Sequence, residues 1–180
     1  MKSIWAILLG GLALIGTAEA RLGQTIEQVQ KDLGPLKLQE DGLYPSELLF
    51  GVAHNQEGFN DLYFQFLKTN KRCVTTRYGK YYKNLADVTL GFLDAKKVVQ
   101  KAFFGSTLSI VESQGIKNGG QNAALWCVTW KTKHGGYAAA TLQKDREGYS
   151  SCPGYTFVVL CKDPTYVKIE STIKPNVKQK

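Results

Sequence analysis

The strongest constraint on the fold is an alternation of apolar and other residues, which begins after Pro35. Leu48, Phe50 and Val52 show it clearly, because a period of two places their side chains on one face of an extended strand. Turn-forming residues separate the successive runs. The pattern predicts strands at residues 48–52, 62–66, 74–78, 88–93, 98–104, 124–131, 137–143, 155–161 and 166–170.

Two short polar connections indicate that neighbouring strands pair as hairpins. Residues 94–97, Asp-Ala-Lys-Lys, separate the runs 88–93 and 98–104. His134-Gly135-Gly136 separates the runs 124–131 and 137–143. Connections of this length join antiparallel strands, so an antiparallel sheet is expected.

The segment before the strands predicts a short amphipathic helix. Ile26, Val29 and Leu33 share one helical face. Thr25 and Gln28 have the spacing of a capping box at the start, and the pair Gly34-Pro35 stops the helix.

A second short helix is predicted at residues 105–115, which include a cap-like Thr107 and end in Gly115. This segment shares the pattern G-x-T-[IL]-x-x-V with the first helix, which suggests two related halves. The alternative is that any short helix capped by threonine shows these four positions. The expected fold class is therefore α+β, an antiparallel sheet of hairpins with two short helices packed on one face.

The first 20 residues have the three parts of a secretory signal peptide. Lys2 precedes an apolar run at residues 4–15, and Ala18-Glu19-Ala20 matches the A-x-A cleavage site. An uncleaved membrane anchor is the alternative, but about 12 helical residues span only about 18 Å of a hydrocarbon core that is about 30 Å thick. We therefore expect a periplasmic or secreted protein with one domain at residues 21–173, a basic tail at 174–180, and no transmembrane segment after cleavage.

The chain is basic, with a formal net charge of +8 that removal of residues 1–20 leaves unchanged. This charge predicts an anionic partner, and outside the cytoplasm the candidates are anionic lipid, acidic glycan or acidic protein. Export makes nucleic acid an unlikely partner. The alternative is that the charge only keeps the protein soluble.

Export also changes how the cysteines are interpreted. In an oxidising compartment, four cysteines predict up to two disulfides, with three possible pairings. No C-x-x-C motif is present, which argues against a thioredoxin-like redox site or a zinc ribbon. The disulfide candidates are Cys73, Cys127, Cys152 and Cys161.

The sequence offers little support for an enzyme, a cofactor or a metal site. His54 and His134 lie among turn-forming residues without a nearby second ligand, and we interpret both as exposed loop histidines. Nucleotide-binding, zinc-protease and serine-hydrolase patterns are absent. A pair of carboxylates far apart in the sequence stays possible as a hydrolytic site. Trp126 and Trp130 share a strand face, which is interpreted as core rather than as a ligand platform.

One segment combines aromatic rings with cations, and we call residues 77–83 the tyrosine–cation segment. Such a segment can stack on flat ligands while its cations neutralise phosphate or carboxylate groups. The alternative is a turn whose tyrosines pack inward and whose charges are solvated. The candidate binding residues are Arg77, Tyr78, Lys80, Tyr81, Tyr82 and Lys83.

The first helix resembles a known family motif. The pattern G-x-T-x-x-x-V-x-x-x-L-G runs from Gly23 to Gly34 and resembles the opening of the small α+β domain in SmpA/OmlA outer-membrane lipoproteins and in secreted β-lactamase inhibitor proteins. The chain departs from both, because it lacks the lipoprotein cysteine and its Pro35 comes one residue early. The hairpin containing Trp126 and Tyr137 also looks like small exported bacterial proteins without an assigned activity. The resemblance implies a helix-on-sheet scaffold used for binding, and it transfers no functional residue.

Two functions follow as hypotheses. The first is a non-enzymatic exported binding module for an anionic partner in the envelope or outside the cell. The alternative is a proteinaceous inhibitor of a secreted enzyme, which we expect to use loops rather than the tyrosine–cation segment.

Overall fold

Eight strands form one open antiparallel sheet in the computed structural model, which describes residues 22–54, 59–104, 106–115, 124–144 and 154–173. The predicted signal peptide, the basic tail and Cys152 lie outside these residues. The strands are β1 (Lys37–Glu40), β2 (Leu48–His54), β3 (Asp61–Leu67), β4 (Cys73–Tyr82), β5 (Leu108–Gly115), β6 (Ala124–Thr132), β7 (Tyr137–Lys144) and β8 (Tyr155–Lys162). The helices are α1 (Ile26–Leu33), α2 (Phe92–Ala102) and α3 (Pro164–Ile173), with a 3₁₀ turn at Leu85–Asp87.

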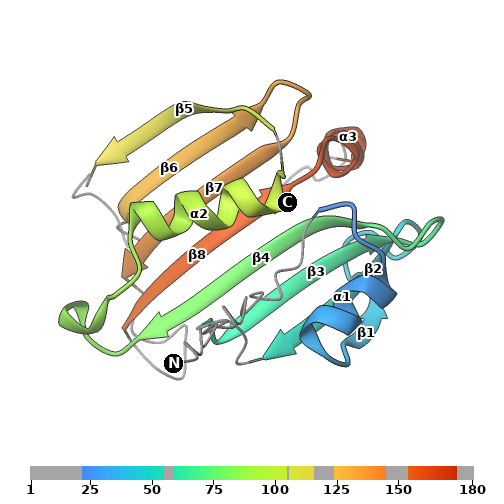
Figure 1. Cartoon of the computed structure of the whole chain (residues 1–180), viewed down its shortest axis with the longest axis horizontal. Coiled ribbons are helices and arrows are strands. Elements are labelled where there is room, and N and C mark those ends of the chain that lie inside the picture. Colours follow the sequence, from blue (N-terminus) through green and yellow to red (C-terminus); the bar gives the residue numbers. More distant parts are fainter. Residues whose placement is uncertain (1–21, 55–58, 105, 116–123, 145–153, 174–180) are drawn as a thin grey trace, which may run out of the picture.

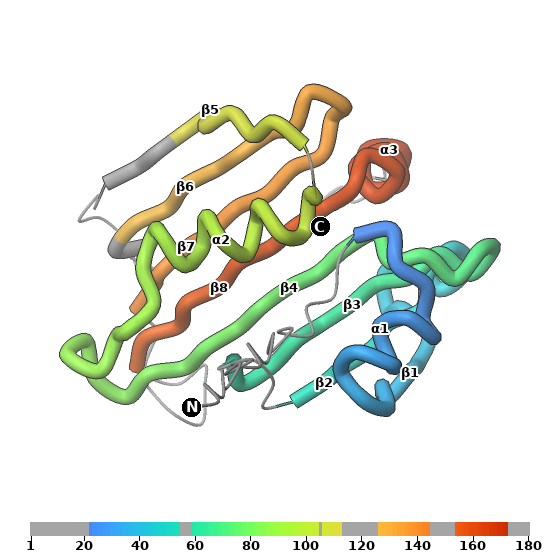
Figure 2. Tube along the Cα trace, in the orientation of Figure 1, coloured from blue at the N-terminus to red at the C-terminus, as the bar shows by residue number. Residues whose placement is uncertain are grey.

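The strand order is β1-β2-β3-β4-β8-β7-β6-β5, with every neighbouring pair antiparallel. Strands β1–β4 and β5–β8 each form a meander, and the two meanders meet along β4 and β8 (Figure 2). A helix precedes each meander in the chain. The predicted α+β class and antiparallel sheet are confirmed.

Helices α1 and α2 lie on the same side of the sheet, α1 beside the first meander and α2 over β7 and β8 (Figure 1). The predicted α1 is confirmed in detail. Thr25 and Gln28 form the capping box at the start of the helix. At its end, the Gly34 N–H donates to the Gln30 carbonyl oxygen. The φ angle of Gly34 is +85°, a backbone conformation that favours glycine. The core lies between these helices and the sheet and contains Val29, Phe64, Val99, Trp130 and Phe157.

The predicted strands at 88–93 and 98–104, with their hairpin at 94–97, are wrong, because this region contains α2. The Asp94 carboxylate accepts a hydrogen bond from the Gly91 N–H at 3.0 Å and so caps the helix. Ala95, Val99 and Ala102 are buried at helical spacing. Packing of this face against the sheet outweighs the strand preference of the β-branched residues in this segment.

The predicted strand at 166–170 is also wrong, because these residues belong to α3. Asp163 caps this helix by accepting hydrogen bonds from the Thr165 and Tyr166 N–H groups at 2.7 and 3.1 Å. Pro164 occupies the first helical position, where its missing N–H has no cost. The pair Asp163-Pro164 is therefore a sequence signal for the start of a helix.

The predicted helix at 105–115 is a third correction, because residues 108–115 form β5 at the edge of the sheet. Its register against β6 shifts between Ile110 and Glu112, as in a β-bulge. The sequence echo of the first helix therefore falls on a strand, and it supports no repeat. At the opposite edge, the short exposed β1 was not predicted.

Candidate binding surface

The side of the sheet opposite α1 and α2 carries half-buried side chains, and we call it the open face. In β3 and β7, buried residues facing the helices alternate with half-buried residues facing the other way. Helix α3 packs over one corner of the open face, where Tyr166 joins Tyr44, Leu48 and Val74 in a small second core. Lys162 donates to Glu170 at 2.8 Å and ties α3 to β8 there.

Strand register brings residues that are far apart in the sequence into one row across the open face. Val52 lies opposite Tyr63, and Tyr63 lies opposite Arg77. Arg77 in turn lies opposite Leu160, which pairs with Ala139. The row crosses five strands and places one guanidinium among one aromatic and three aliphatic side chains.

Two rings and this cation form the centre of the open face. The Phe50 and Tyr63 rings stack with centroids 5.6 Å apart and an interplanar angle of 27°. The Arg77 guanidinium carbon lies 5.2 Å from the Tyr63 ring centroid, within the range of a cation–π contact. No ion pair is formed by Arg77 with a carboxylate of the described residues. Its positive charge is therefore not neutralised by this part of the chain.

A small pocket of about 260 Å³ opens beside this centre. Its walls include Phe50, Tyr63, Thr75, Arg77 and Leu160. Thr75 is 5% exposed, and its hydroxyl has no hydrogen-bond partner within the described part of the chain. An unsatisfied buried hydroxyl is uncommon in folded proteins because it loses its bonds to water without replacement.

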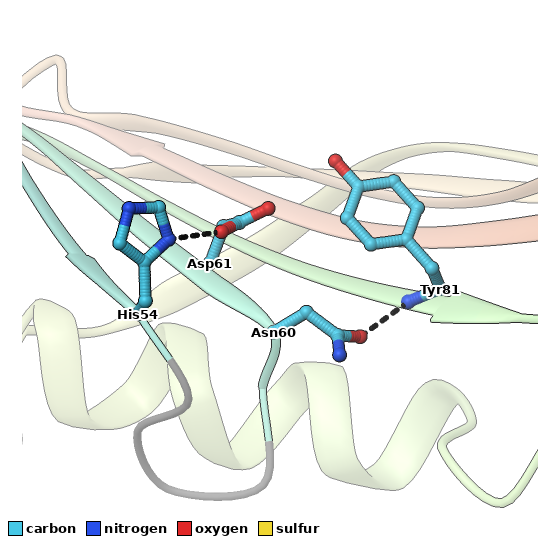
Figure 3. Close-up of polar contacts among 4 residues, drawn as sticks. All are labelled: His54, Asn60, Asp61 and Tyr81. Carbon is cyan, nitrogen blue, oxygen red and sulfur yellow. Dashed lines mark hydrogen bonds and ion pairs between the residues drawn. The ribbon is translucent and has the colours of Figure 1, made fainter. Parts of the chain in front are cut away.

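Polar residues continue the open face beyond the pocket. His54 Nδ1 lies 2.6 Å from Asp61 Oδ1 across β2 and β3, and the Asn60 side chain accepts the Tyr81 backbone N–H at 2.8 Å (Figure 3). The pKa of Tyr63 is raised, first by burial and then by the negative charge of the nearby Asp61 carboxylate. The His54, Asp61 and Tyr81 side chains lie on the side of the strands away from α2 (Figure 3).

The tyrosine–cation segment does not form a single surface, because β4 alternates between the two sides of the sheet. Tyr78 and Tyr82 are 3% and 8% exposed and belong to the core under the helices. Arg77 and Tyr81 lie on the open face, and Lys83 is exposed just beyond the end of β4. The predicted surface of six residues is therefore corrected to Arg77 and Tyr81 on one face.

Lys80 lies on the helix side of β4 and makes a separate contact. Its ammonium nitrogen is 5.5 Å from the centroid of the Tyr82 ring. Its register partner in β8 is the fully buried Phe157. Lys80 therefore points away from Arg77.

Several smaller predictions have clear outcomes. His54 and His134 are exposed as expected, although His54 ends a strand and has Asp61 as its partner. Trp126 and Trp130 face the helices and pack in the core, which confirms their interpretation. In the described ranges, no three His, Cys, Asp or Glu side chains gather as metal ligands. No described helix is long and apolar enough to cross a membrane.

Cys73, Cys127 and Cys161 are free thiols in the described part of the chain, and Cys152 lies outside it, so the predicted disulfides stay a prediction. Cys127 lies on the open face, opposite Thr141, whereas Cys73 and Cys161 are in the core under the helices. Cys161 pairs with Thr76, three residues along β4 from Cys73. At about 3.3 Å per residue, this offset exceeds the roughly 7 Å Cα separation that a disulfide allows.

These positions predict a clear order of thiol reactivity. Burial raises the pKa of Cys73 far above its usual value and that of Cys161 to about 12. Burial and the nearby Glu112 carboxylate also raise the pKa of Cys127, which is only partly buried. Since the thiolate is the reactive form, iodoacetamide should label Cys127 before the other two described thiols, at a rate that still rises above pH 9. Peptide mass spectrometry measures this order, and labelling of Cys73 or Cys161 before unfolding would contradict it.

Comparisons of the chain with models of protein families, with curated proteins and with solved structures give no match. The resemblance of the first helix to SmpA/OmlA lipoproteins and β-lactamase inhibitor proteins therefore stays a prediction.

Proposed function

We propose that this protein is a non-enzymatic binding protein that docks an acidic protein surface on the open face of its sheet. The observation that carries the proposal is Arg77, a cation without an ion pair in the described part of the chain, beside the stacked rings of Phe50 and Tyr63. The overall charge of +8 supports an acidic partner, because it steers anionic surfaces toward the protein.

The residue types on the open face support a protein as the occupant. Aromatic residues and arginine are enriched in protein interfaces, and they supply a large part of the binding energy when they are well packed. Here one arginine and two rings lie within a broad face that also presents Val52 and Leu160. An anionic membrane is recognised mainly by clusters of lysine and arginine, whereas this face concentrates its apolar surface around one half-buried guanidinium.

Only the sequence supports a proposal for the cellular location in which the partner is bound. The signal-peptide pattern at residues 1–20 supports an encounter in the periplasm or outside the cell. The acidic partner is then another exported or surface protein.

Binding of a Glu/Tyr copolymer, used as a model of an acidic protein surface, tests this proposal. Arg77→Glu should weaken its binding at least tenfold, because the substitution places a carboxylate at the centre of the face. Lys96→Glu makes the same charge change on α2, on the other side of the sheet, and should weaken binding less than threefold. Raising the salt concentration from 50 to 300 mM should also weaken binding of the unmodified protein.

The same titration is repeated with vesicles of phosphatidylcholine and phosphatidylglycerol and with polygalacturonate. Equal losses for Arg77→Glu and Lys96→Glu, or binding to vesicles or polygalacturonate alone, would overturn the proposal. If the natural partner proves to be an enzyme that loses activity in the complex, the protein is an inhibitor, the alternative that the sequence leaves open.

A further inference from the structure

The pocket beside Arg77 has a hydroxyl donor that the described part of the chain does not use. Thr75 is 95% buried in the middle of the sheet, and its hydroxyl has no partner in the described ranges although it can donate one hydrogen bond. Arg77 adds a guanidinium whose charge has no carboxylate partner there. A positive charge and an unused hydroxyl in one pocket wall suit an anion that accepts hydrogen bonds.

Two carboxylates of the described residues that lie close to pocket-lining residues are engaged elsewhere. Asp61, near the Tyr63 hydroxyl, lies 2.6 Å from His54 Nδ1. Asp41 accepts hydrogen bonds from the Gln65 side chain at 2.6 Å and from two backbone N–H groups. Neither forms an ion pair with Arg77.

The remaining walls are largely apolar, and they limit the size of the occupant. The Phe50 and Tyr63 rings and the Leu160 side chain line the pocket together with Arg77, Thr75 and Gln65, whose side-chain amide already donates to Asp41. The volume of about 260 Å³ is below the roughly 300–1,000 Å³ that is typical of sites for drug-sized ligands. The pocket therefore suits one small group with a compact apolar part.

We infer that this pocket binds a carboxylate attached to a small apolar group, with Arg77 as its counter-charge, Thr75 as a hydrogen-bond donor and the rings of Phe50 and Tyr63 against its apolar part. A free organic acid has this chemistry, and so does the terminal or side-chain carboxyl group of a bound acidic protein. The second source rests on the proposed function, whereas the first does not. Arg77 and Thr75 would both contact the ligand directly.

Titration with phenylacetate tests the inference, with phenylacetamide as the uncharged control of the same shape. Phenylacetate should saturate the site and should bind at least tenfold more tightly than the amide. Arg77→Gln should weaken phenylacetate at least tenfold, since it removes the counter-charge. Backbone NMR shifts at Phe50, Tyr63 and Leu160 locate the bound acid.

A pair of adjacent threonines provides the matched control. Thr75→Val should weaken phenylacetate about three- to tenfold, because it removes one hydrogen bond to a charged ligand. Thr76 is fully buried and its hydroxyl also has no hydrogen-bond partner in the described ranges, but it lies on the helix side opposite Cys161, so Thr76→Val should change the affinity less than twofold. Thr75→Val should leave the unfolding midpoint unchanged or raise it, which separates lost binding from lost folding.

Equal affinity for acid and amide, no saturable binding, or equal effects of Thr75→Val and Thr76→Val would overturn the inference. Binding of the Glu/Tyr copolymer without binding of phenylacetate would leave the proposed function standing and remove the pocket from it. Binding of phenylacetate alone would identify a free acid as the ligand and would count against the acidic protein partner.

Discussion

Replacing Trp130 with alanine is expected to lower the free energy of unfolding by about 3–5 kcal/mol, the usual cost of removing a large buried aromatic side chain. Trp130 is the largest of the fully buried side chains, at 1% exposure. Its ring stacks on Phe92 of α2 with centroids 6.0 Å apart, so it fills the space between β6 and this helix. The substitution should leave a cavity at the place where α2 meets the sheet.

Urea unfolding followed by the far-ultraviolet circular dichroism of the backbone measures this loss. Leu93→Ala is the control, because Leu93 is on the same helix but is 67% exposed, and its replacement should change stability by less than about 0.5 kcal/mol. A loss below about 1 kcal/mol for Trp130→Ala would mean that α2 does not depend on this contact.

Gly154→Ala is expected to destabilise the protein by about 3 kcal/mol or more, the upper part of the range for over-packed sites. A Cβ atom at this position would lie 2.2 Å from the Tyr82 carbonyl oxygen and 3.3 Å from the Lys83 Cα. Both are backbone atoms, so no side-chain rotation can relieve the clash. Gly154 immediately precedes β8, which pairs with β4 where the two meanders meet.

The matched control for Gly154 is Gly42→Ala, because a Cβ atom at Gly42 meets nothing within 4 Å. Thermal unfolding of the two variants compares them directly. Gly42→Ala should keep the melting temperature of the unmodified protein within about 2 °C, in line with the small effect of ordinary surface changes. Similar melting temperatures for both variants would show that the β4–β8 junction adjusts to the extra atom.

The variants at Trp130 and Gly154 test the stability of the sheet and its helix layer, not the pocket. Trp130 and Gly154 maintain the sheet and its helix layer, and neither lines the pocket beside Arg77. Loss of copolymer or phenylacetate binding in Trp130→Ala would therefore report unfolding. Loss of binding in Thr75→Val, with stability retained, would report the pocket itself.

Local sequence patterns determined the first helix and most of the strands. Thr25, Gln28 and Gly34 act on backbone groups within a few residues, so the limits of α1 could be predicted without knowledge of its neighbours. The alternation in β3 and β7 predicted strands correctly for the same reason, since a period of two is a property of the strand itself.

Tertiary packing decided the segments in which local preferences conflict. Val98 and Val99 favour a strand, yet they belong to α2, because Ala95, Val99 and Ala102 form one buried helical face. Residues 108–115 show the opposite case, in which a helix-like sequence is used as the edge strand paired with β6. Asp163 and Pro164 are a local start signal for α3, whereas the apolar residues at 166–170 that follow them favour a strand.

The candidate site shows the same division. The sequence alone showed the basic charge and named Arg77 as a candidate binding residue, but it grouped Arg77 with its chain neighbours Tyr78 and Tyr82, whose side chains lie in the core. The partners of Arg77 on the open face, Tyr63 and Leu160, come from strands distant in the chain, and only the register of the folded sheet makes them neighbours. Cross-strand contacts of this kind depend on long-range pairing, which a local pattern does not encode.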